Sequence, residues 1–268
     1  MADPSPSSDS KEAQLKFWNS TSAVDQYAFS KRPPFLYPAE RRLLGLYRDR
    51  WPDVRMLDIG IGAGRTSHYF AALAGQYAGI DFAPNMIEAC RKRFAGRWPG
   101  AMFQEGDATA LKEHADDSYD LVLFSFNGID CLPYPQRQQA LSEMQRVCRP
   151  GGRIVFSSHN LYHISRIPTF HFHAHPMRLR EEICRWWQVQ RRNPPVLEAM
   201  AGSYCEYDDG NIGANRLMFI RPEVQTADLA DLGLEVTGRY ANDGRELVTD
   251  EDGRNPDISW LYYFCRKP

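Results

Sequence analysis

The sequence predicts an α/β fold in which helices cover both faces of a mostly parallel β-sheet. First, a short apolar run at residues 56–59 ends in glycines at alternate positions, as a buried parallel strand does where it enters a tight turn. Second, strand-like and helix-like segments alternate after this turn, which is typical of a parallel sheet. Right-handed crossovers would place the glycine turn at the carboxyl edge of the sheet, where such folds bind ligands.

The predicted elements follow in order along the chain. Apolar and aromatic residues between 11 and 30 predict one or two helices, and another helix follows Pro38. The core then alternates strands at 54–59, 76–81, 101–105, 119–126 and 152–158 with helices at 65–74, 84–95 and 134–148. A long insert rich in aromatic residues and histidine breaks this rhythm. After the insert, residues 229–240 predict a helix, a turn and a strand, and residues 258–267 predict the last strand.

Composition limits the classes of protein to consider. The 268-residue chain can hold one large domain with a cap, and its 43% hydrophobic content can supply a sizeable core. The formal net charge of −2 argues against a nucleic-acid enzyme with a broad basic surface. Six cysteines without a C-x-x-C pair indicate reduced thiols in a cytoplasmic protein. We expect a monomer or a homodimer. No apolar stretch approaches the ~20 residues of a membrane span, so no membrane partner is expected.

These patterns divide the chain into four expected parts. The parts are a disordered N-terminus at 1–12, a core with N-terminal lid helices at 13–158, a substrate-cap insert at 159–225, and the C-terminal part of the core sheet at 226–268.

The glycine turn indicates which nucleotide it would bind. Gly60, Gly62 and Gly64 alternate, and Arg65 stands at the position where the dinucleotide fingerprint Gly-x-Gly-x-x-Gly has its third glycine. Asp58 lies two residues before the first glycine. A carboxylate there would repel a pyrophosphate but would attract a cationic amino group. The pattern therefore favours an adenosyl ligand that carries an amino acid, with NAD as the alternative.

A second acid supports this interpretation. Asp81 ends the predicted strand 76–81, and it lies 21 residues after Gly60, close to the spacing at which an acid reaches ribose hydroxyls. A carboxylate can accept two hydrogen bonds from a vicinal diol, and the next residue, Phe82, can cover an adenine. Pro84 then suits the first turn of the following helix.

Several sequence blocks in order resemble the class I S-adenosylmethionine-dependent methyltransferases of the small-molecule acceptor type. The blocks are MLDIGIGAGR (56–65), YAGIDFAPNMIEAC (77–90), FQEGDATAL (103–111), SYDLVLFSFNGID (118–130) and EMQRVCRPGGRIVFSS (143–158). The resemblance implies a Rossmann-like, seven-stranded, mostly parallel sheet with a final antiparallel hairpin. It also implies an α-rich lid formed by the N-terminus and the insert.

The same resemblance implies S-adenosyl-L-methionine as the cofactor and S-adenosyl-L-homocysteine as its product. Asp107 would then meet the adenine amine, and the N-terminal Tyr27 and Arg32 would help to close the site over the methyl donor. The cofactor-binding residues implied in this way are Tyr27, Arg32, Asp58, Gly60, Gly62, Gly64, Asp81, Phe82, Met86, Asp107, Ala108 and Ser125.

His159 and Asp130 are the candidate catalytic residues. His159 directly follows the predicted strand 152–158, at the edge of the sheet where ligands bind, and a histidine side chain titrates near neutrality. Asp130 follows the strand 119–126, and it could act as a base or as an orienting acceptor. Structural alternatives remain open, since His159 could simply end a strand and Asp130 could cap a helix. Methyl transfer from a sulfonium needs alignment above all, and a base only for a protonated acceptor.

The candidate substrate-binding residues are Asn127, His159, His163, Trp186 and Tyr204. Aromatic walls with nearby arginines suit a planar or anionic small molecule. The alternative for residues 178–192 is an ordinary amphipathic helix with tryptophans toward the core. His171, His173 and His175 would share one face of a strand, but they would span about 13 Å, too far for one ion. We therefore predict no metal.

The sequence predicts S-adenosylmethionine-dependent methyl transfer to a nitrogen or oxygen of a small, planar or aromatic metabolite by direct in-line displacement. Two alternatives remain. An RNA or protein methyltransferase could dock through the basic insert, although the net charge argues against it. A non-catalytic adenosyl-binding subunit is the other, although the complete glycine loop argues against it.

Overall fold

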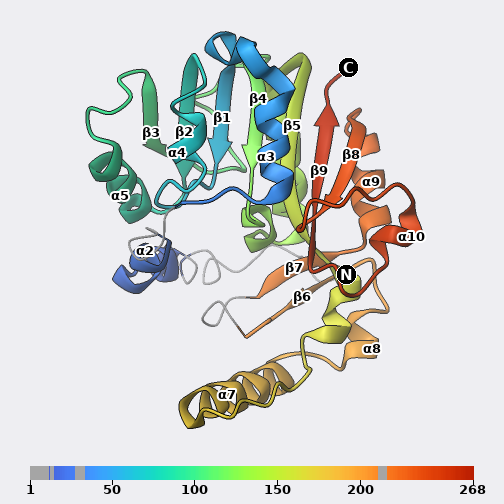
Figure 1. Ribbon diagram of the computed structural model, residues 1–268. Helices are drawn as coiled ribbons and strands as arrows, with labels where there is room; N and C mark the ends of the chain where they lie inside the picture. Colours follow the sequence, from blue (N-terminus) through green and yellow to red (C-terminus); the bar gives the residue numbers. More distant parts are fainter. Residues whose placement is uncertain (1–11, 13–14, 28–33, 211–215) are drawn as a thin grey trace.

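The computed structural model describes residues 12, 15–27, 34–210 and 216–268 (Figure 1). These residues contain one nine-stranded sheet with the order β3-β2-β1-β4-β5-β7-β6, and β9 pairs with both β5 and β8. The strands are β1 (Arg55–Ile59), β2 (Gln76–Asp81), β3 (Ala101–Glu105), β4 (Tyr119–Phe124), β5 (Cys148–Asn160), β6 (Tyr204–Tyr207), β7 (Leu217–Ile220), β8 (Glu235–Ala241) and β9 (Trp260–Arg266).

Helices flank the sheet on both faces. The described α-helices are α2 (Thr21–Tyr27), α3 (Pro38–Tyr47), α4 (Ser67–Phe70), α5 (Pro84–Phe94), α6 (Tyr134–Val147), α7 (Pro176–Arg192), α8 (Val196–Ala199), α9 (Pro222–Asp231) and α10 (Asp250–Gly253). One core cluster joins side chains of α6 and α9 to the sheet, and a second joins side chains of α3 and α4 to it. None of the described helices is both long and apolar enough to cross a lipid bilayer.

The parallel core confirms the predicted fold class. β1 pairs in parallel with β2 and β4, β2 with β3, and β4 with β5. All residues of β1 after Arg55 are buried, because a central parallel strand is covered on both faces. This burial explains why the strand reads as a continuous apolar run broken only by Asp58. The expected antiparallel closure is also present, since β9 runs antiparallel to β5 and β8.

Two elements differ in length from the prediction. The helix expected at 65–74 shortens to α4, because residues 62–66 form turns and the chain turns again before Gly75. At Gly75 a Cβ would lie 1.9 Å from the carbonyl oxygen of Pro52, so the chain must pass very close there. β5 is longer than expected, because Cys148 at its start pairs with Tyr119 of β4 and Asn160 at its end pairs with Ile220 of β7.

The insert adds two strands that the sequence analysis did not predict. The antiparallel hairpin β6–β7 joins the end of β5, where His159 pairs with Phe219 and Asn160 with Ile220. The last pairing of β4 with β5 comes earlier, between Phe124 and Phe156. The hairpin therefore extends the sheet past the end of β4, and the insert is not purely α-helical. The short apolar run of β7, which is buried throughout, makes this possible, whereas β6 contains Glu206 and is only partly buried.

Candidate active site

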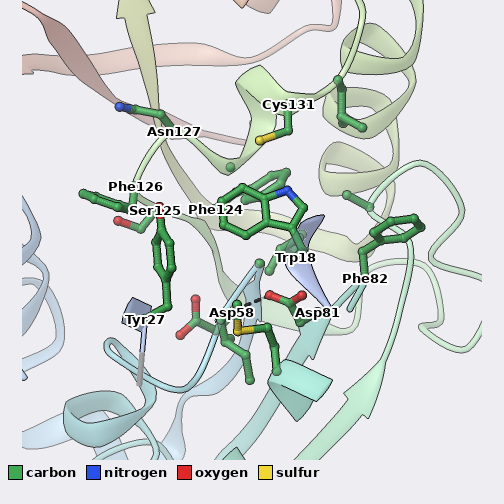
Figure 2. Close-up of a pocket in the computed structure, with 18 of the residues that line it drawn as sticks. Trp18, Tyr27, Asp58, Asp81, Phe82, Phe124, Ser125, Phe126, Asn127 and Cys131 are labelled. Atoms are coloured by element: carbon green, nitrogen blue, oxygen red, sulfur yellow. Dashed lines mark hydrogen bonds between the residues drawn. The ribbon is translucent and has the colours of Figure 1, made fainter. Parts of the chain in front are cut away.

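A cavity of about 400 Å³ opens at the carboxyl edge of the sheet, within the range of small-molecule sites. Its walls come from the glycine turn after β1, the ends of β2 and β4, the turn after β4, His159 of β5, and the N-terminal Trp18 and Tyr27. In the view of Figure 2, Asp58 and Asp81 lie below, and Asn127 and Cys131 lie above. As predicted, the carboxyl ends of several strands lie together at one site.

The glycine turn is organised by Asp81. Gly60, Gly62 and Gly64 have φ values of +65°, +55° and +88°, which residues with a side chain rarely adopt. The Asp81 carboxylate accepts the backbone N–H of Gly62 at 2.8 Å and that of Ala83 at 2.9 Å. Each carboxylate oxygen keeps further acceptor capacity on the cavity side. Asp81 thus shapes the turn and can still accept ligand hydroxyls.

The three glycines have different surroundings. Gly60 and Gly62 line the cavity, whereas Gly64 does not. A Cβ on Gly64 would lie 2.4 Å from the Phe94 ring and 2.9 Å from the sulfur of Cys90 on α5. The expectation that Gly64 contacts the cofactor is therefore corrected, because its lack of a side chain lets α5 pack against the turn.

Asp58 is a buried carboxylate beside the cavity. Its Oδ2 accepts the hydroxyls of Thr66 and Tyr77, both at 2.7 Å. Burial raises the pKa of Asp58 to about 7, although both hydroxyl donors oppose the shift. A cation bound nearby would favour the charged carboxylate. Binding of a cationic ligand beside Asp58 would therefore favour loss of its proton.

The other predicted cofactor residues fall into three groups. Phe82, Met86, Asp107 and Ala108 line the cavity beside Asp81. Tyr27 and Ser125 also line it. Burial raises the pKa of Tyr27 to about 12, so its hydroxyl keeps its proton at neutral pH. Arg32 lies outside the described residues.

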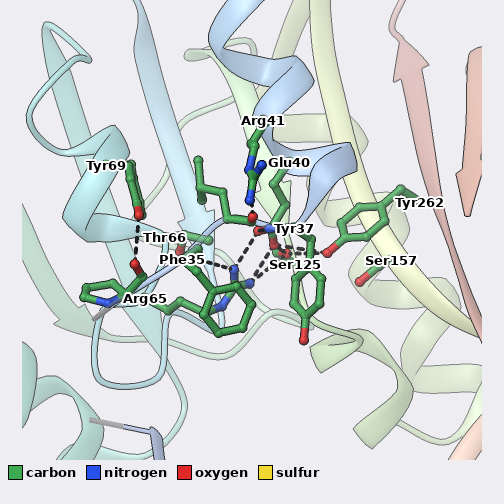
Figure 3. A network of polar contacts seen from close by, with 12 residues as sticks. Phe35, Tyr37, Glu40, Arg41, Arg65, Thr66, Tyr69, Ser125, Ser157 and Tyr262 are labelled. Carbon is green, nitrogen blue, oxygen red and sulfur yellow. Dashed lines mark hydrogen bonds and ion pairs between the residues drawn. The ribbon is translucent and has the colours of Figure 1, made fainter. Parts of the chain in front are cut away.

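A buried ion pair, which the sequence analysis missed, ties the N-terminal region to the glycine turn (Figure 3). Arg65 donates to both carboxylate oxygens of Glu40 at 2.6 Å. The same carboxylate accepts the backbone N–H of Tyr37 at 2.7 Å and the hydroxyls of Ser125 and Tyr262. Glu40 is fully buried and Arg65 is 6% exposed. No local signal marks this pair, because its members lie 25 residues apart.

Aromatic rings form another wall of the cavity. The Tyr37 ring stacks on Phe126 with centroids 5.6 Å apart, and it meets Trp260 edge-on at 5.6 Å. Tyr27 contacts Phe126 from the N-terminal side at 6.2 Å. The Arg65 guanidinium lies 5.3 Å from the centroids of both Tyr37 and Phe126. This wall presents flat apolar surfaces, which suit a planar ligand.

Asp130 and His159 form one hydrogen-bonded pair. Asp130 Oδ2 lies 2.8 Å from His159 Nδ1 and accepts the His159 backbone N–H at 2.6 Å. Beside a carboxylate, Nδ1 carries the proton, so neutral His159 has its lone pair on Nε2. Nε2 faces the Asn127 amide nitrogen at 3.2 Å, and both residues line the cavity. The two candidate catalytic residues are therefore brought together.

A buried arginine, also missed from the sequence, holds this pair. Arg137 of α6 donates to Asp130 Oδ1 at 2.5 Å and to the Ser158 hydroxyl at 2.9 Å, and Gln225 accepts two of its N–H groups. The Ser158 hydroxyl in turn donates to Asp130 Oδ1 at 2.9 Å. Arg137 and Asp130 have fully buried side chains. The Asp130 carboxylate is thus fixed by four hydrogen bonds from the described residues.

Three predicted substrate residues do not line the cavity. His163 Nδ1 bonds the carbonyl oxygen of Pro256 at 2.7 Å, because residues 161–166 turn away after β5. Trp186 lies on α7, where it contacts Phe170 and Trp187. Tyr204 stacks on Tyr134 with centroids 4.1 Å apart. These placements correct the expectation for His163, Trp186 and Tyr204.

The histidines of the insert also lie differently from the expectation. His171, His173 and His175 fall in an irregular segment before α7 and not on a strand. Within the described residues, no group of three side chains of the metal-binding types could hold an ion.

The residues present fit an adenosyl ligand that carries an amino acid. Asp81 and Asp107 supply acceptors for hydroxyl and amine groups, and Phe82 and Met86 supply apolar surface for a base. A turn without side chains at Gly60 and Gly62 allows the ligand to approach the backbone. Asp58 supplies negative charge for an ammonium group. This set of contacts matches S-adenosylmethionine better than a pyrophosphate-containing dinucleotide.

Comparisons of the sequence agree with this geometry. Residues 56–152 match a family described as a methyltransferase domain. A demethylmenaquinone methyltransferase of Renibacterium salmoninarum is 38% identical over 104 residues, which cover 39% of this chain and 40% of that protein. A phthiotriol/phenolphthiotriol dimycocerosates methyltransferase of Mycobacterium leprae is 31% identical over 144 residues, covering 49% of this chain and 51% of that one. The chain thus spans about half or less of the length of these relatives.

Solved structures share the fold across nearly the whole chain. An S-adenosylmethionine-dependent methyltransferase from Clostridium acetobutylicum has a TM-score of 0.63 at 10% identity, covering 91% of this chain and 97% of that one. DhpI in a complex with SAM and HEP has a TM-score of 0.58 at 17% identity, covering 98% and 100%. At these identities the likeness concerns the fold, while the family match concerns the segment that builds the glycine turn. Residues 56–152 of the chain are therefore similar to a methyltransferase domain, and the chain shares its fold with S-adenosylmethionine-dependent methyltransferases.

Proposed function

We propose that the chain is an enzyme that transfers the methyl group of S-adenosylmethionine to a nitrogen or oxygen of a small, planar or aromatic acceptor by direct in-line displacement. One observation carries this proposal. His159, which the buried Asp130 holds in the geometry of an oriented base, lines the same cavity as the glycine turn and Asp81. A binding subunit without activity would not require such a pair.

The chain's own residues would hold the methyl donor. When bound, S-adenosylmethionine supplies a methyl group that its positive sulfur has already activated. Asp81 would accept ribose hydroxyls, Asp107 would accept the adenine amine, and Asp58 would face the amino group. Trp18 and Tyr27 line the cavity from the N-terminal side, and they would exclude water from it.

His159 would take the proton of the acceptor. Its Nδ1–H donates to Asp130, so the lone pair is on Nε2, where it now faces the Asn127 amide N–H at 3.2 Å. The acceptor's proton would replace this amide N–H at Nε2. Asp130 would orient the ring and stabilise the imidazolium that forms, in the manner of a base held by a buried carboxylate. Arg137 keeps Asp130 in place. Asp130 therefore has the role of an orienting acceptor in this proposal and not that of a base.

The shape of the cavity favours a flat, largely apolar acceptor. Tyr37, Phe126 and Trp260 present ring faces and edges to it. Two relatives carry names of small-molecule methyltransferases, which agrees with an acceptor of this size. The insert 159–225 would act as a cap, since its hairpin contributes Leu217 to the cavity and its loop contributes Asp209.

Calorimetry with adenosylhomocysteine and transfer from methyl-labelled donor test the proposal together. We expect heat of binding, and we expect labelled small molecules, detected by mass spectrometry, when the protein and donor are added to a cell extract. With an acceptor identified, His159→Ala should lower kcat about 100-fold or more while leaving adenosylhomocysteine affinity unchanged.

Each failure has a distinct meaning. No heat with adenosylhomocysteine, alongside tight binding of NAD, would remove the cofactor assignment. Binding without any labelled product would favour a non-catalytic subunit. If His159→Ala and His159→Asn both kept near wild-type rates, alignment alone would drive transfer and His159 would only shape the cavity.

A further inference from the structure

Helix α7 extends from the insert on the side of the molecule away from the core helices, and only one of its sides packs against the protein (Figure 1). On that inner side Val189 is fully buried and Glu182 is 7% exposed. Arg185 donates to Glu182 at 2.6 Å and to the carbonyl oxygens of Ile167 and Thr169 at 3.0 and 2.8 Å. The helix is therefore fixed to the insert by its inner side.

The outer side of α7 exposes large apolar side chains. Met177 is 67% exposed, Ile183 42% and Trp187 55%. They alternate with Arg180 and Arg191 at spacings of three and four residues, which places all five on one stripe of the helix. We call these five residues the α7 stripe. An exposed tryptophan next to an exposed isoleucine indicates a surface that another molecule covers.

The chain before the helix continues the apolar character. Phe172 is 78% exposed and Phe170 42% exposed. Neither ring is needed to fill the core of the insert, whose buried cluster is formed by other residues such as Leu161, Ile164 and Phe219. The exposed apolar surface is thus shared by α7 and the segment that leads into it.

The charge of this surface has one sign. The α7 stripe contains Arg180 and Arg191 and no acid. Arg178 and Arg192 are exposed on the same helix, and Arg178, Arg180 and Arg191 make no ion pair within the described part of the chain. The single exposed acid of the helix is Glu181, whereas the whole chain has a net charge of −2. The basic charge is therefore local, and it calls for a negative partner.

We infer that the α7 stripe docks on an anionic lipid surface. A helix that carries apolar and aromatic side chains beside arginines can insert the rings and aliphatic groups among acyl chains while the guanidinium groups reach the headgroups. A second copy of the same stripe would be a poorer partner, because it would bring arginines together without an acid to pair them. The 17-residue helix, about 25 Å long, offers a convex face of the kind that lies in a bilayer surface.

This inference departs from the expectation of no membrane partner. That expectation rested on the absence of a spanning segment, whereas binding at the lipid surface needs only one amphipathic face. It does not depend on the proposed methyl transfer.

Co-sedimentation of the full chain with lipid vesicles tests the inference. The vesicles would contain phosphatidylcholine alone or with phosphatidylglycerol. We expect binding to the phosphatidylglycerol vesicles at least tenfold stronger than to the neutral ones, and weaker binding at high salt. The apolar variant Ile183→Ser/Trp187→Ser and the charge variant Arg180→Gln/Arg191→Gln should each lower the fraction bound about tenfold or more.

A matched control changes the same residue types elsewhere. Val248 is 81% exposed and Arg50 is exposed, and both lie outside the insert, so Val248→Ser/Arg50→Gln should bind vesicles as the wild type does. Circular dichroism and adenosylhomocysteine binding would show that each variant is folded. Equal loss in the control and stripe variants would overturn the inference, as would equal binding to neutral vesicles. A dimer seen by sedimentation and abolished by the stripe variants, without vesicle binding, would assign the face to self-association and also overturn it.

Discussion

Breaking the buried Arg137–Asp130 pair should strongly destabilise the protein. Arg137→Met removes the guanidinium but keeps much of the side-chain volume in a position without solvent contact. The Asp130 carboxylate then keeps its bonds to His159 and Ser158 but loses its buried counter-charge, and Gln225 loses the donor to its side-chain oxygen. Removing one partner of a fully buried pair costs about 3–5 kcal/mol, a large part of the 5–15 kcal/mol that is typical of a folded domain.

Urea unfolding followed by circular dichroism measures this free energy. A double-mutant cycle adds Asp130→Asn, which neutralises the partner. If the pair acts as described, Arg137→Met/Asp130→Asn should cost at least about 2 kcal/mol less than the sum of the two single changes, because no uncompensated charge remains. The matched control is Arg166→Met, since Arg166 and Asp257 make an ion pair at 2.9 Å with half or more of each side chain exposed. That change should cost less than about 1 kcal/mol.

Two results would contradict this reasoning. The first is a cost for Arg137→Met no larger than that for Arg166→Met, which would mean that water or a shifted side chain compensates Asp130. The second is strict additivity in the cycle, which would mean that the two residues stabilise the fold independently.

Three further predictions concern the cofactor side of the site. Burial raises the pKa of Asp58 from an ordinary value near 3.8 to about 7, so below pH 7 the cationic end of adenosylhomocysteine can bind only when Asp58 releases its proton. The dissociation constant of adenosylhomocysteine should therefore rise about tenfold per pH unit below 7 in the wild type and should not change with pH in Asp58→Asn. Calorimetry from pH 5.5 to 8.5 distinguishes the two profiles. Asp81→Ala should raise the same dissociation constant about 30-fold, or about 2 kcal/mol, by removing acceptors for ribose hydroxyls, and an unchanged value would make Asp81 purely structural. Gly64→Ala should lower the free energy of unfolding by about 2 kcal/mol or more, because the new Cβ would clash with the Phe94 ring and because φ at this position is +88°. The control is Gly45→Ala in α3, where nothing lies within 4 Å; it should raise the free energy of unfolding by about 0.5–1 kcal/mol. Equal effects of the two changes in urea unfolding would show that the glycine turn can relax.

Local signals in the sequence predicted the parts of the site that depend on neighbouring residues. The apolar run of β1 and the glycines after it determine a buried strand and a turn with positive φ angles, and both are present. Asp81 ends β2 as predicted. The pairing of β2 with β1 has no irregularity, so the strand ends where the sequence pattern ends. His159 was expected directly after the strand 152–158; β5 continues to Asn160, so His159 lies within the end of the strand, still at the carboxyl edge as predicted.

The tertiary structure decided which of these residues act together. Asp130 and His159 were two separate candidates, and only the neighbouring ends of β4 and β5 make them one pair. Arg137 and Gln225 lie 88 residues apart and meet because α6 and α9 pack on the same face of the sheet. Such contacts depend on strand register and helix packing, which no local pattern encodes.

In the insert, residue type alone led to wrong predictions of substrate-binding residues. Trp186 and Tyr204 have the residue types of a ligand wall, yet they lie on α7 and on β6, and neither lines the cavity. The sequence by itself determined the fold class, the glycine turn and the strand-end acids, because these follow from short-range backbone geometry and burial. The buried ion pairs, the aromatic wall and the exposed side of α7 were decided by tertiary packing, because a side chain's surroundings depend on residues that the fold brings from far along the chain.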